Sequence, residues 1–390
     1  MTPRSITIIG AGMGGLTTAL ALRQAGHTVH VFDRVSALRP AGAALSVWSN
    51  GVKVLAALGL ETRLKAASGT MTHMAYADQH GRPLTHFDIT PLYSRVGQPA
   101  CPIARTALQT LLLEAVGEDR VSLGENCTHY TTTETGITAH FNSGLTVESD
   151  LLVVADGTHS ILRNQAMGET IERRYCGYVN WNGRVPVTPE LGDPECWIQY
   201  VGHGQRVSMM PMGEVDGVPH FYFFLDVPLP DGTPNDPGQY RAELARHFDG
   251  WAEPVQTLIA RIDPAHMARV EIHDIDPLPR LTASRVALLG DAAHGMSPDL
   301  GQGGCQAMED AWVLARALDD ADTLDEALAT YDHRRVDRVG DIILRARKRA
   351  ATTHGKIPAL THSWYQELTE ETGEHIMAGM EKTILGGPLV

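Results

Sequence analysis

The chain has 390 residues, of which 43% are hydrophobic, so it can bury a large core and is long for a single domain. Its formal net charge of -14 argues against nucleic acid and against anionic membranes as partners, because both would repel such a surface. The 5 cysteines show no C-x-x-C spacing, which argues against a disulfide framework and a zinc site. No apolar run approaches the roughly 20 residues of a membrane span. We therefore expect a cytoplasmic, globular protein without a metal site.

The beginning of the chain shows the pattern of a dinucleotide-binding fold. Residues 5–9 form a short apolar run that ends at a glycine, which is typical of a buried parallel strand. Apolar residues at 16, 19 and 20 predict one face of a helix, and Gly26 is placed to end it. Residues 27–33 form a second apolar run and predict a second strand.

The turn between the first strand and the helix carries a G-x-G-x-x-G fingerprint in the context that this motif requires. Gly10 permits a tight turn, Gly12 lets the backbone approach a pyrophosphate, and Gly15 allows the helix to pack closely. The helix N-terminus attracts phosphate through its free N–H groups and its dipole. Asp33, at the end of the second strand, is placed to accept hydrogen bonds from a ribose.

Glycine turns also follow two later predicted strands. Residues 150–155 form a buried strand that ends at Asp156, and residues 285–289 form another that leads through a glycine to Asp291. A glycine-rich stretch at 301–304 then opens a further helix. Ligands of open α/β sheets bind at the carboxyl ends of the strands, so all these turns can hold one extended cofactor. We expect FAD rather than NAD, because a simple dehydrogenase has no use for turns so far beyond the first phosphate site.

The middle of the chain differs from both ends. Between about 175 and 226, aromatic residues, valine and threonine fall into period-two stretches, which predict antiparallel strands. We predict a mixed α/β fold, in which a Rossmann-like FAD-binding domain carries an inserted antiparallel-sheet substrate domain and precedes a C-terminal helical segment. The FAD-binding domain is assigned to residues 1–70, 100–172 and 272–345, the substrate domain to 71–99 and 173–271, and the helical segment to 346–390.

These segments together resemble the single-component FAD-dependent aromatic hydroxylases of the para-hydroxybenzoate hydroxylase type. The resemblance runs through nearly the whole chain and rests on the glycine turn at 10–15, Arg105 within R-T-A-L-Q, Asp156 with its glycine, and the turns at 290–291 and 301–304. Within that family the chain is similar to the bacterial FAD-dependent urate hydroxylases. The stretches that carry this second likeness are 43–53, 177–183, 206–208, 221–224, 271–275 and 364–368.

The resemblance implies an oxidoreductase that reduces FAD with NADH as co-substrate, forms a flavin C4a-hydroperoxide with dioxygen, and hydroxylates urate at C5 to give 5-hydroxyisourate. It also implies a monomer or a homodimer. Arg206, Tyr222 and Asp299 would act as one unit on the substrate, with the Tyr222 hydroxyl fixing the angle of the guanidinium. The residues that would bind the substrate are Asn180, Arg206, Tyr222 and Gly301. The residues that would hold FAD are Gly10, Gly12, Gly14, Gly15, Asp33, Arg34, Ser46, Arg105, Cys127, Asp156, Asp291, Gly301, Gln302, Gly303, Gly304 and Cys305.

Alternatives to urate hydroxylation remain open from the residues alone. Arg206 would anchor a carboxylate equally well, so the substrate could be another small electron-rich aromatic acid, salicylate-like or hydroxypyridine-like. A flavin-binding regulatory or oxidase-like protein that does not hydroxylate is an alternative of a different class. His273 and Asp274 are neighbours on a predicted strand and face opposite ways, so we expect them to be structural. We expect His294 to cap backbone groups rather than to take part in catalysis.

Overall fold

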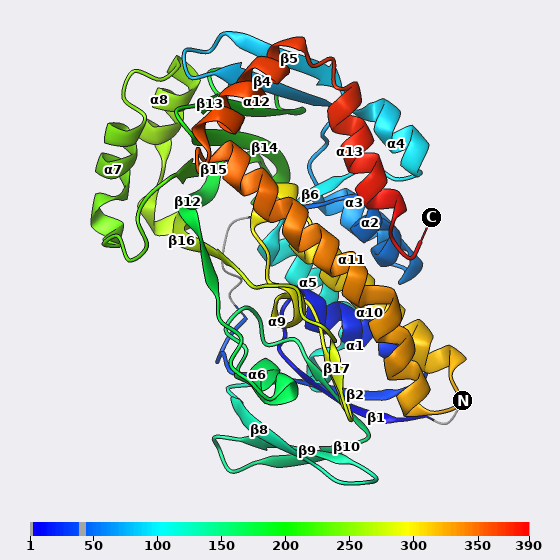
Figure 1. Cartoon of the computed structure of the whole chain (residues 1–390). Coiled ribbons are helices and arrows are strands. Elements are labelled where there is room, and N and C mark those ends of the chain that lie inside the picture. The colour runs from blue at the N-terminus through cyan, green and yellow to red at the C-terminus, as the bar shows by residue number, and fades with distance from the viewer. Residues whose placement is uncertain (1–2, 39–43, 390) are drawn as a thin grey trace.

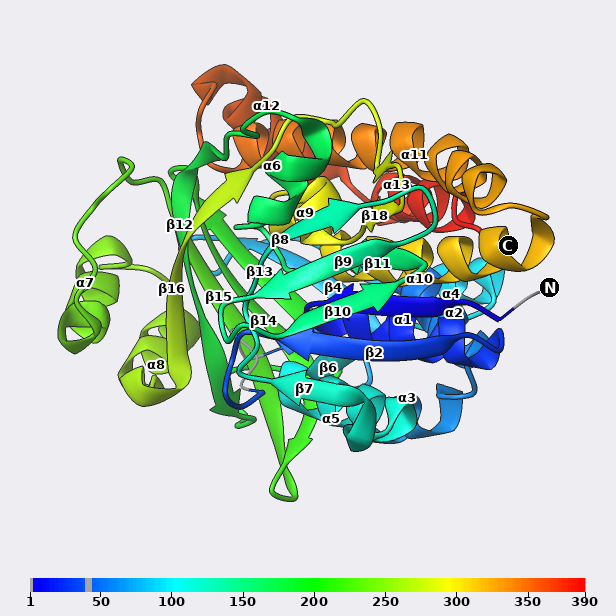
Figure 2. The ribbon, with the colours of Figure 1, turned by 90° about the horizontal axis from the view of Figure 1, so that it is seen from below.

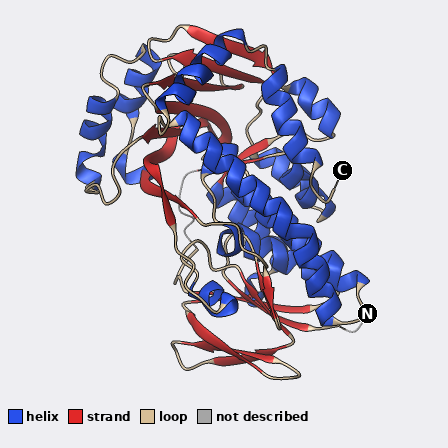
Figure 3. Cartoon of the chain, in the orientation of Figure 1, coloured by secondary structure: helices blue, strands red, loops and turns tan. Residues whose placement is uncertain are grey.

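The computed structural model describes residues 3–38 and 44–389, so Ala43, the first residue of the 43–53 stretch, lies outside the described residues. The strands gather in two groups at opposite ends of the molecule, with helices between and beside them (Figures 1 and 3). This arrangement confirms the predicted mixed α/β fold. No helix in the described part of the chain is long and apolar enough to cross a membrane.

The first group is built on a 6-stranded sheet of order β17-β18-β11-β1-β2-β7. Strand β1 (Ser5–Ile9) pairs in parallel with β2 (Thr28–Asp33) on one side and with β11 (Leu151–Val154) on the other. The remaining strands are β7 (Val121–Leu123), β17 (Thr282–Ala283) and β18 (Val286–Leu288), of which β18 is parallel to β11. The glycine turns after β1, β11 and β18 therefore leave the sheet at the same edge, as the sequence predicts.

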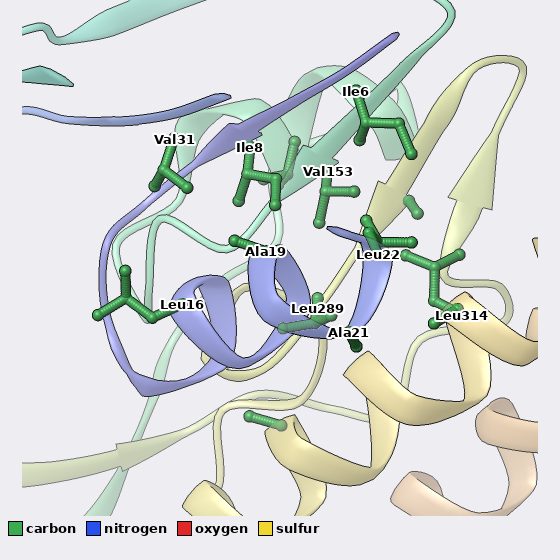
Figure 4. Close-up of a cluster of buried hydrophobic side chains, with 14 of the residues drawn as sticks. Ile6, Ile8, Leu16, Ala19, Ala21, Leu22, Val31, Val153, Leu289 and Leu314 are labelled. Atoms are coloured by element: carbon green, nitrogen blue, oxygen red, sulfur yellow. The ribbon is translucent and has the colours of Figure 1, made fainter. Parts of the chain in front are cut away.

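Helix α1 (Met13–Gln24) packs its apolar side on this sheet and against α10 (Gly303–Asp320). Figure 4 shows the resulting cluster, to which Ile8, Val31 and Val153 contribute from the sheet and Leu16 and Ala19 from the helix. Residue 26 follows the helix end with a positive φ of 89°, a conformation that favours glycine, and this confirms the predicted stop.

Two smaller sheets lie beside the 6-stranded one. The sheet of β8 (Cys127–Thr132), β9 (Ile137–Phe141) and β10 (Thr146–Ser149) lies in front of it in the view of Figure 2 and contacts β1 and β11. The pair β3 (Ala44–Val47) and β6 (Cys101–Ala104) lies toward the second group of strands. The short helices of this half are α2 (Ser49–Ala57), α3 (Glu61–Ala67), α5 (Arg105–Val116), α6 (Ile161–Met167) and α9 (Asp291–His294), whereas α4 (Thr90–Val96) lies at the other end of the molecule in Figure 1.

The second group is a 7-stranded sheet of order β16-β12-β15-β14-β13-β4-β5. Its strands are β4 (His73–Asp78), β5 (Pro83–Asp88), β12 (Arg174–Pro186), β13 (Cys196–Gly202), β14 (Gln205–Val215), β15 (Val218–Val227) and β16 (Met267–Asp274). All pairings are antiparallel, as predicted, except that β13 runs parallel to β4. One face packs an apolar core against α7 (Tyr240–His247) and α8 (Glu253–Arg261), which lie on the outer side in Figure 2.

The C-terminal part of the chain is helical and runs along both groups of strands (Figure 1). Helix α11 (Leu324–Thr353) begins with a capping box between Thr323 and Glu326, and α12 (Pro358–Glu370) and α13 (Glu374–Leu385) follow it. The boundary predicted between residues 345 and 346 falls inside α11, so this helix belongs to both proposed segments. The division into domains remains a prediction.

Candidate active site

A cavity of about 1570 Å³ lies where the glycine turns of the 6-stranded sheet meet the polar face of the 7-stranded sheet. This volume exceeds the roughly 300–1,000 Å³ of an ordinary small-molecule pocket, so it has room for an extended cofactor and a substrate together. Helices α12 and α13 close one side of it.

The glycines of the first turn serve two different purposes. A Cβ atom at Gly10 would lie 2.1 Å from the backbone oxygen of Ala155, and one at Gly15 would lie 1.9 Å from the backbone oxygen of Gly10. These two glycines are required by the packing of the protein itself. A Cβ at Gly12 would meet nothing within 4 Å and would point into open space, and Gly12 lines the cavity. The fingerprint therefore leaves a space at a helix N-terminus, which fits the pyrophosphate of a dinucleotide.

The later glycine turns line the same side of the cavity. Cavity-lining residues include Ser46, Arg105 and Asp291, together with Gly14, Gly301, Gln302, Gly303 and Gly304. The last of these open the 18-residue helix α10, whose free N–H groups lie at the cavity. Trp48 also lines it, and its buried indole nitrogen has no hydrogen-bond partner among the residues that the structure describes. The residues present thus fit an extended, polar cofactor such as FAD.

Several residues expected to hold the cofactor do not line the cavity. Asp33 Oδ2 accepts a hydrogen bond from the Ala11 backbone at 2.7 Å, so this carboxylate holds the glycine turn in place. Cys127 lies in the apolar core, where burial raises the pKa of its thiol to about 11. Cys305 Sγ accepts from the Trp48 backbone at 3.3 Å, and burial raises the pKa of this thiol to about 12. Arg34 is exposed outside the cavity. Direct contacts of these residues with FAD remain predictions.

A buried polar network supports the turn that carries Asp291. Asp310 Oδ2 accepts hydrogen bonds from the Gly290 backbone at 3.0 Å and from His294 Nε2 at 2.6 Å, while Asp310 Oδ1 binds Arg335 at 2.6 Å. Burial alone would raise the pKa of Asp310, but the charges of Arg335 and His294 hold it at about 2. The expectation that His294 caps backbone groups is wrong, because its ring binds a carboxylate instead.

Arg206 is the central cation of the opposite wall. Its Nε donates to Asp226 Oδ2 at 2.8 Å and its Nη2 to Asp299 Oδ1 at 3.2 Å, and its guanidinium lies 5.0 Å from the centre of the Phe224 ring. The residue is only 5% exposed. Burial would lower the pKa of Arg206, but the two carboxylates raise it well above its usual range, so the guanidinium stays charged. Its Nη1 has no partner within residues 3–38 and 44–389 and can donate into the cavity.

Asp299 is held from two further sides. The hydroxyl of Tyr178 donates to its Oδ2 at 2.7 Å, and Nε2 of His354 lies 3.3 Å from its Oδ1. Burial alone would raise the pKa of Asp299, but the contact with His354 and the charge of Arg206 hold this pKa well below its usual range. Arg206 and Asp299 thus meet as expected, and Asp299 is ionised.

Tyr222 does not make the expected hydrogen bond. It faces the cavity and points away from Phe221 and Phe223, as predicted, yet no hydrogen bond joins it to Arg206 in the described part of the structure. Instead its ring packs 5.8 Å from that of Phe224, and burial raises the pKa of its hydroxyl to about 12. The tyrosine that fixes this unit is Tyr178, which acts through Asp299.

Four site residues were missed by the sequence prediction. Asn180 donates to Asp226 Oδ1 at 2.6 Å and accepts from Asn182 at 2.8 Å, so Asp226 and Asn182 belong to the same cluster. A signal existed for three of them: Tyr178 and Asn182 share a strand face with Asn180, and Asp226 shares one with Tyr222. The fourth, His354, follows the end of α11, and no local pattern marks it.

His273 and Asp274 have different surroundings, in keeping with the predicted opposite orientation of their side chains. Asp274 is buried and its Oδ2 accepts from Arg347 at 2.8 Å. His273 faces Glu271 and the exposed Asp231, with ligand atoms within 4.8 Å of one another. Surface acidic groups commonly gather in this way without a metal ion.

Comparison with known proteins supports a flavoenzyme. The family described as FAD binding domain matches residues 4–346. An FAD-dependent urate hydroxylase of Klebsiella pneumoniae is 48% identical over 383 residues, which are 98% of this chain and 99% of that protein. One of Mycolicibacterium vanbaalenii is 45% identical over 388 residues, covering 98% of this chain and 97% of the relative. The crystal structure of Klebsiella pneumoniae HpxO complexed with FAD and uric acid superposes with a TM-score of 0.95 at 47% identity, covering 99% of this chain and 98% of the other.

Proposed function

The chain belongs to the FAD-binding family of the FAD-dependent urate hydroxylases, and from this we propose that it hydroxylates urate at C5 to 5-hydroxyisourate, with FAD as cofactor and NADH and dioxygen as co-substrates. The observation that carries the proposal is Arg206. A charged guanidinium, buried and fixed by two carboxylates, lines a cavity that the glycine turns also line, and one of its nitrogens has no partner in the described part of the chain.

The cofactor would occupy the glycine side of the cavity. The turn at Gly12 and the start of α1 would hold the pyrophosphate, and Asp291 with the start of α10 would hold the part beyond it. When bound, the flavin supplies the redox chemistry, taking electrons from NADH and passing one oxygen atom of dioxygen to an electron-rich substrate.

The residues of the opposite wall would bind and orient urate. Arg206 Nη1 donates to an anionic oxygen or nitrogen of the purine, while Asp226 and Asp299 occupy its other nitrogens and prevent rotation. The amide of Asn180, itself fixed by Asp226, offers hydrogen bonds to the urea-like edges of urate. The Phe224 ring and neighbouring aromatic residues keep water from the reacting atoms.

The test is anaerobic flavin reduction by NADH, followed by stopped-flow absorbance, with urate, xanthine, salicylate and a hydroxypyridine as effectors. We expect urate alone to accelerate reduction and, once oxygen is admitted, to yield 5-hydroxyisourate. Acceleration by an aromatic acid instead would establish the other hydroxylase assignment. NADH oxidation that forms peroxide without a hydroxylated product from any effector would identify an oxidase.

A further inference from the structure

His354 reaches the carboxylates that bind Arg206 from a distant part of the chain. It follows α11, and its ring is buried between the turn at Gly204 and the carboxylates that bind Arg206. Nδ1 lies 3.3 Å from the Gly204 backbone oxygen, and Nε2 lies 3.3 Å from Asp299 Oδ1 and 4.0 Å from Asp226 Oδ2. The ring stacks on Tyr178 with centres 3.7 Å apart.

The surroundings of the two ring nitrogens favour a charged ring. Both face oxygen acceptors, and only an imidazolium carries an N–H on each nitrogen. A neutral ring would turn a lone pair either to the carbonyl of Gly204 or to the carboxylate of Asp299. Nε2 lies at ion-pair distance from Asp299 Oδ1 and makes no hydrogen bond among the described residues, so the attraction between the two groups is electrostatic. The stacked phenol of Tyr178 also favours a cation.

The charges around this ring balance only when it is protonated. The charged and titratable groups that face it are Asp299, Asp226 and the Tyr178 phenol, with Arg206 joined to both carboxylates. Two carboxylates and one guanidinium carry a net charge of minus one, and an imidazolium brings this to zero. In a buried site of low dielectric, an uncompensated negative charge would strongly oppose the binding of an anion.

We propose that His354 is a positioning residue, whose imidazolium neutralises Asp299 so that the free Nη1 of Arg206 can bind an anionic substrate. The proposal rests on the proposed function, because urate is the anion concerned. It assigns a direct role in the site to the C-terminal segment. It also gives urate binding a pH dependence: affinity is greatest where the ring is protonated and falls as rising pH removes that proton.

The experiment measures the Kd of urate for the FAD-loaded protein between about pH 6 and pH 8, within the range where histidine changes charge. For His354→Gln, we expect Kd to rise roughly 10- to 100-fold at the acid end, as for the loss of one member of a buried charge cluster, and to lose most of its pH dependence. His333→Gln, which changes an exposed histidine on α11, is the matched control and should behave as wild type.

Two further measurements separate charge balance from a structural effect. The double variant His354→Gln with Asp299→Asn should bind urate more tightly than His354→Gln alone, because the unpaired negative charge has been removed. Asp299→Asn alone should lose the pH dependence seen in wild type, and this holds even if His354→Gln does not fold. Equal pH profiles in wild type and Asp299→Asn, or no recovery in a folded double variant, would overturn the role of His354. A wild type that fails to bind urate at any pH would overturn the proposed function itself.

Discussion

Two glycines of the same turn should respond in opposite ways to a single added methyl group. In Gly10→Ala the new Cβ would lie 2.1 Å from the Ala155 backbone oxygen, at a residue whose φ is 113°. The clash costs about 1–3 kcal/mol as overpacking, and the backbone conformation adds about 1–2 kcal/mol for a non-glycine residue. The free energy of unfolding should therefore fall by roughly 2–5 kcal/mol.

In Gly12→Ala the methyl group meets nothing within 4 Å, and the φ of -73° suits any residue. The free energy of unfolding, measured in urea without FAD, should change by no more than about 0.5 kcal/mol. FAD affinity, measured by quenching of flavin fluorescence, should fall at least tenfold, or about 1.4 kcal/mol, because the methyl occupies the proposed pyrophosphate space. Gly12→Val should abolish retention of FAD. Wild-type FAD affinity in Gly12→Ala would refute the assignment of this space to the cofactor.

Other residues of the site give three more predictions. Arg206→Ala should weaken urate binding by about 2–4 kcal/mol in calorimetric titration, with only partial rescue by lysine, which lacks the fork geometry; unchanged affinity would contradict the assignment. Tyr178→Phe should lower product formation more than NADH oxidation, and in combination with Asp299→Ala it should add little to the loss that Asp299→Ala causes alone. The loss caused by Tyr222→Phe should instead add to that of Asp299→Ala. The reverse pattern would favour the arrangement first predicted, in which Tyr222 fixes Arg206. The pKa of Asp310 is about 2 in the folded protein and about 3.9 in the unfolded chain, so its ionised form stabilises the fold by roughly 2.5 kcal/mol above pH 3.9. This stabilisation is lost as the pH falls toward 2. The free energy of unfolding of Asp310→Asn, measured in urea, should therefore fall less than that of wild type as the pH is lowered.

The cofactor side of the site could be predicted because its residues are fixed by local requirements. A glycine such as Gly15 is forced by a backbone contact with Gly10, a few residues away, and a short apolar run before a glycine already indicates a buried strand. The alternation that set Tyr222 opposite Phe223 follows from strand geometry alone.

The residues of the substrate side were harder to predict, because they are brought together by contacts that no local sequence pattern encodes. Asp226 meets Arg206 because β14 and β15 pair with these residues opposite each other, and a shift of one residue would turn the carboxylate to the apolar face. The sequence prediction missed Tyr178 for a related reason, since its hydrogen bond to Asp299 depends on where the Asp299 loop lies in the folded chain. The position of His354 could not be predicted from the sequence, because it depends on the path of the 30-residue helix α11.

The cluster around Arg206 fixes the orientation of the guanidinium rather than adding to the stability of the fold. Replacing a buried ion pair with well-packed apolar residues is often neutral or stabilising, so two carboxylates on one guanidinium are weak evidence for a gain in folding free energy. Their effect here is to occupy Nε and Nη2, so that Nη1 is the guanidinium nitrogen left without a partner among residues 3–38 and 44–389. An arginine held in this way can bind an anion without first losing its own conformational freedom. Because the two carboxylates would otherwise repel that anion, the same arrangement requires a second cation, and His354 is placed to supply it.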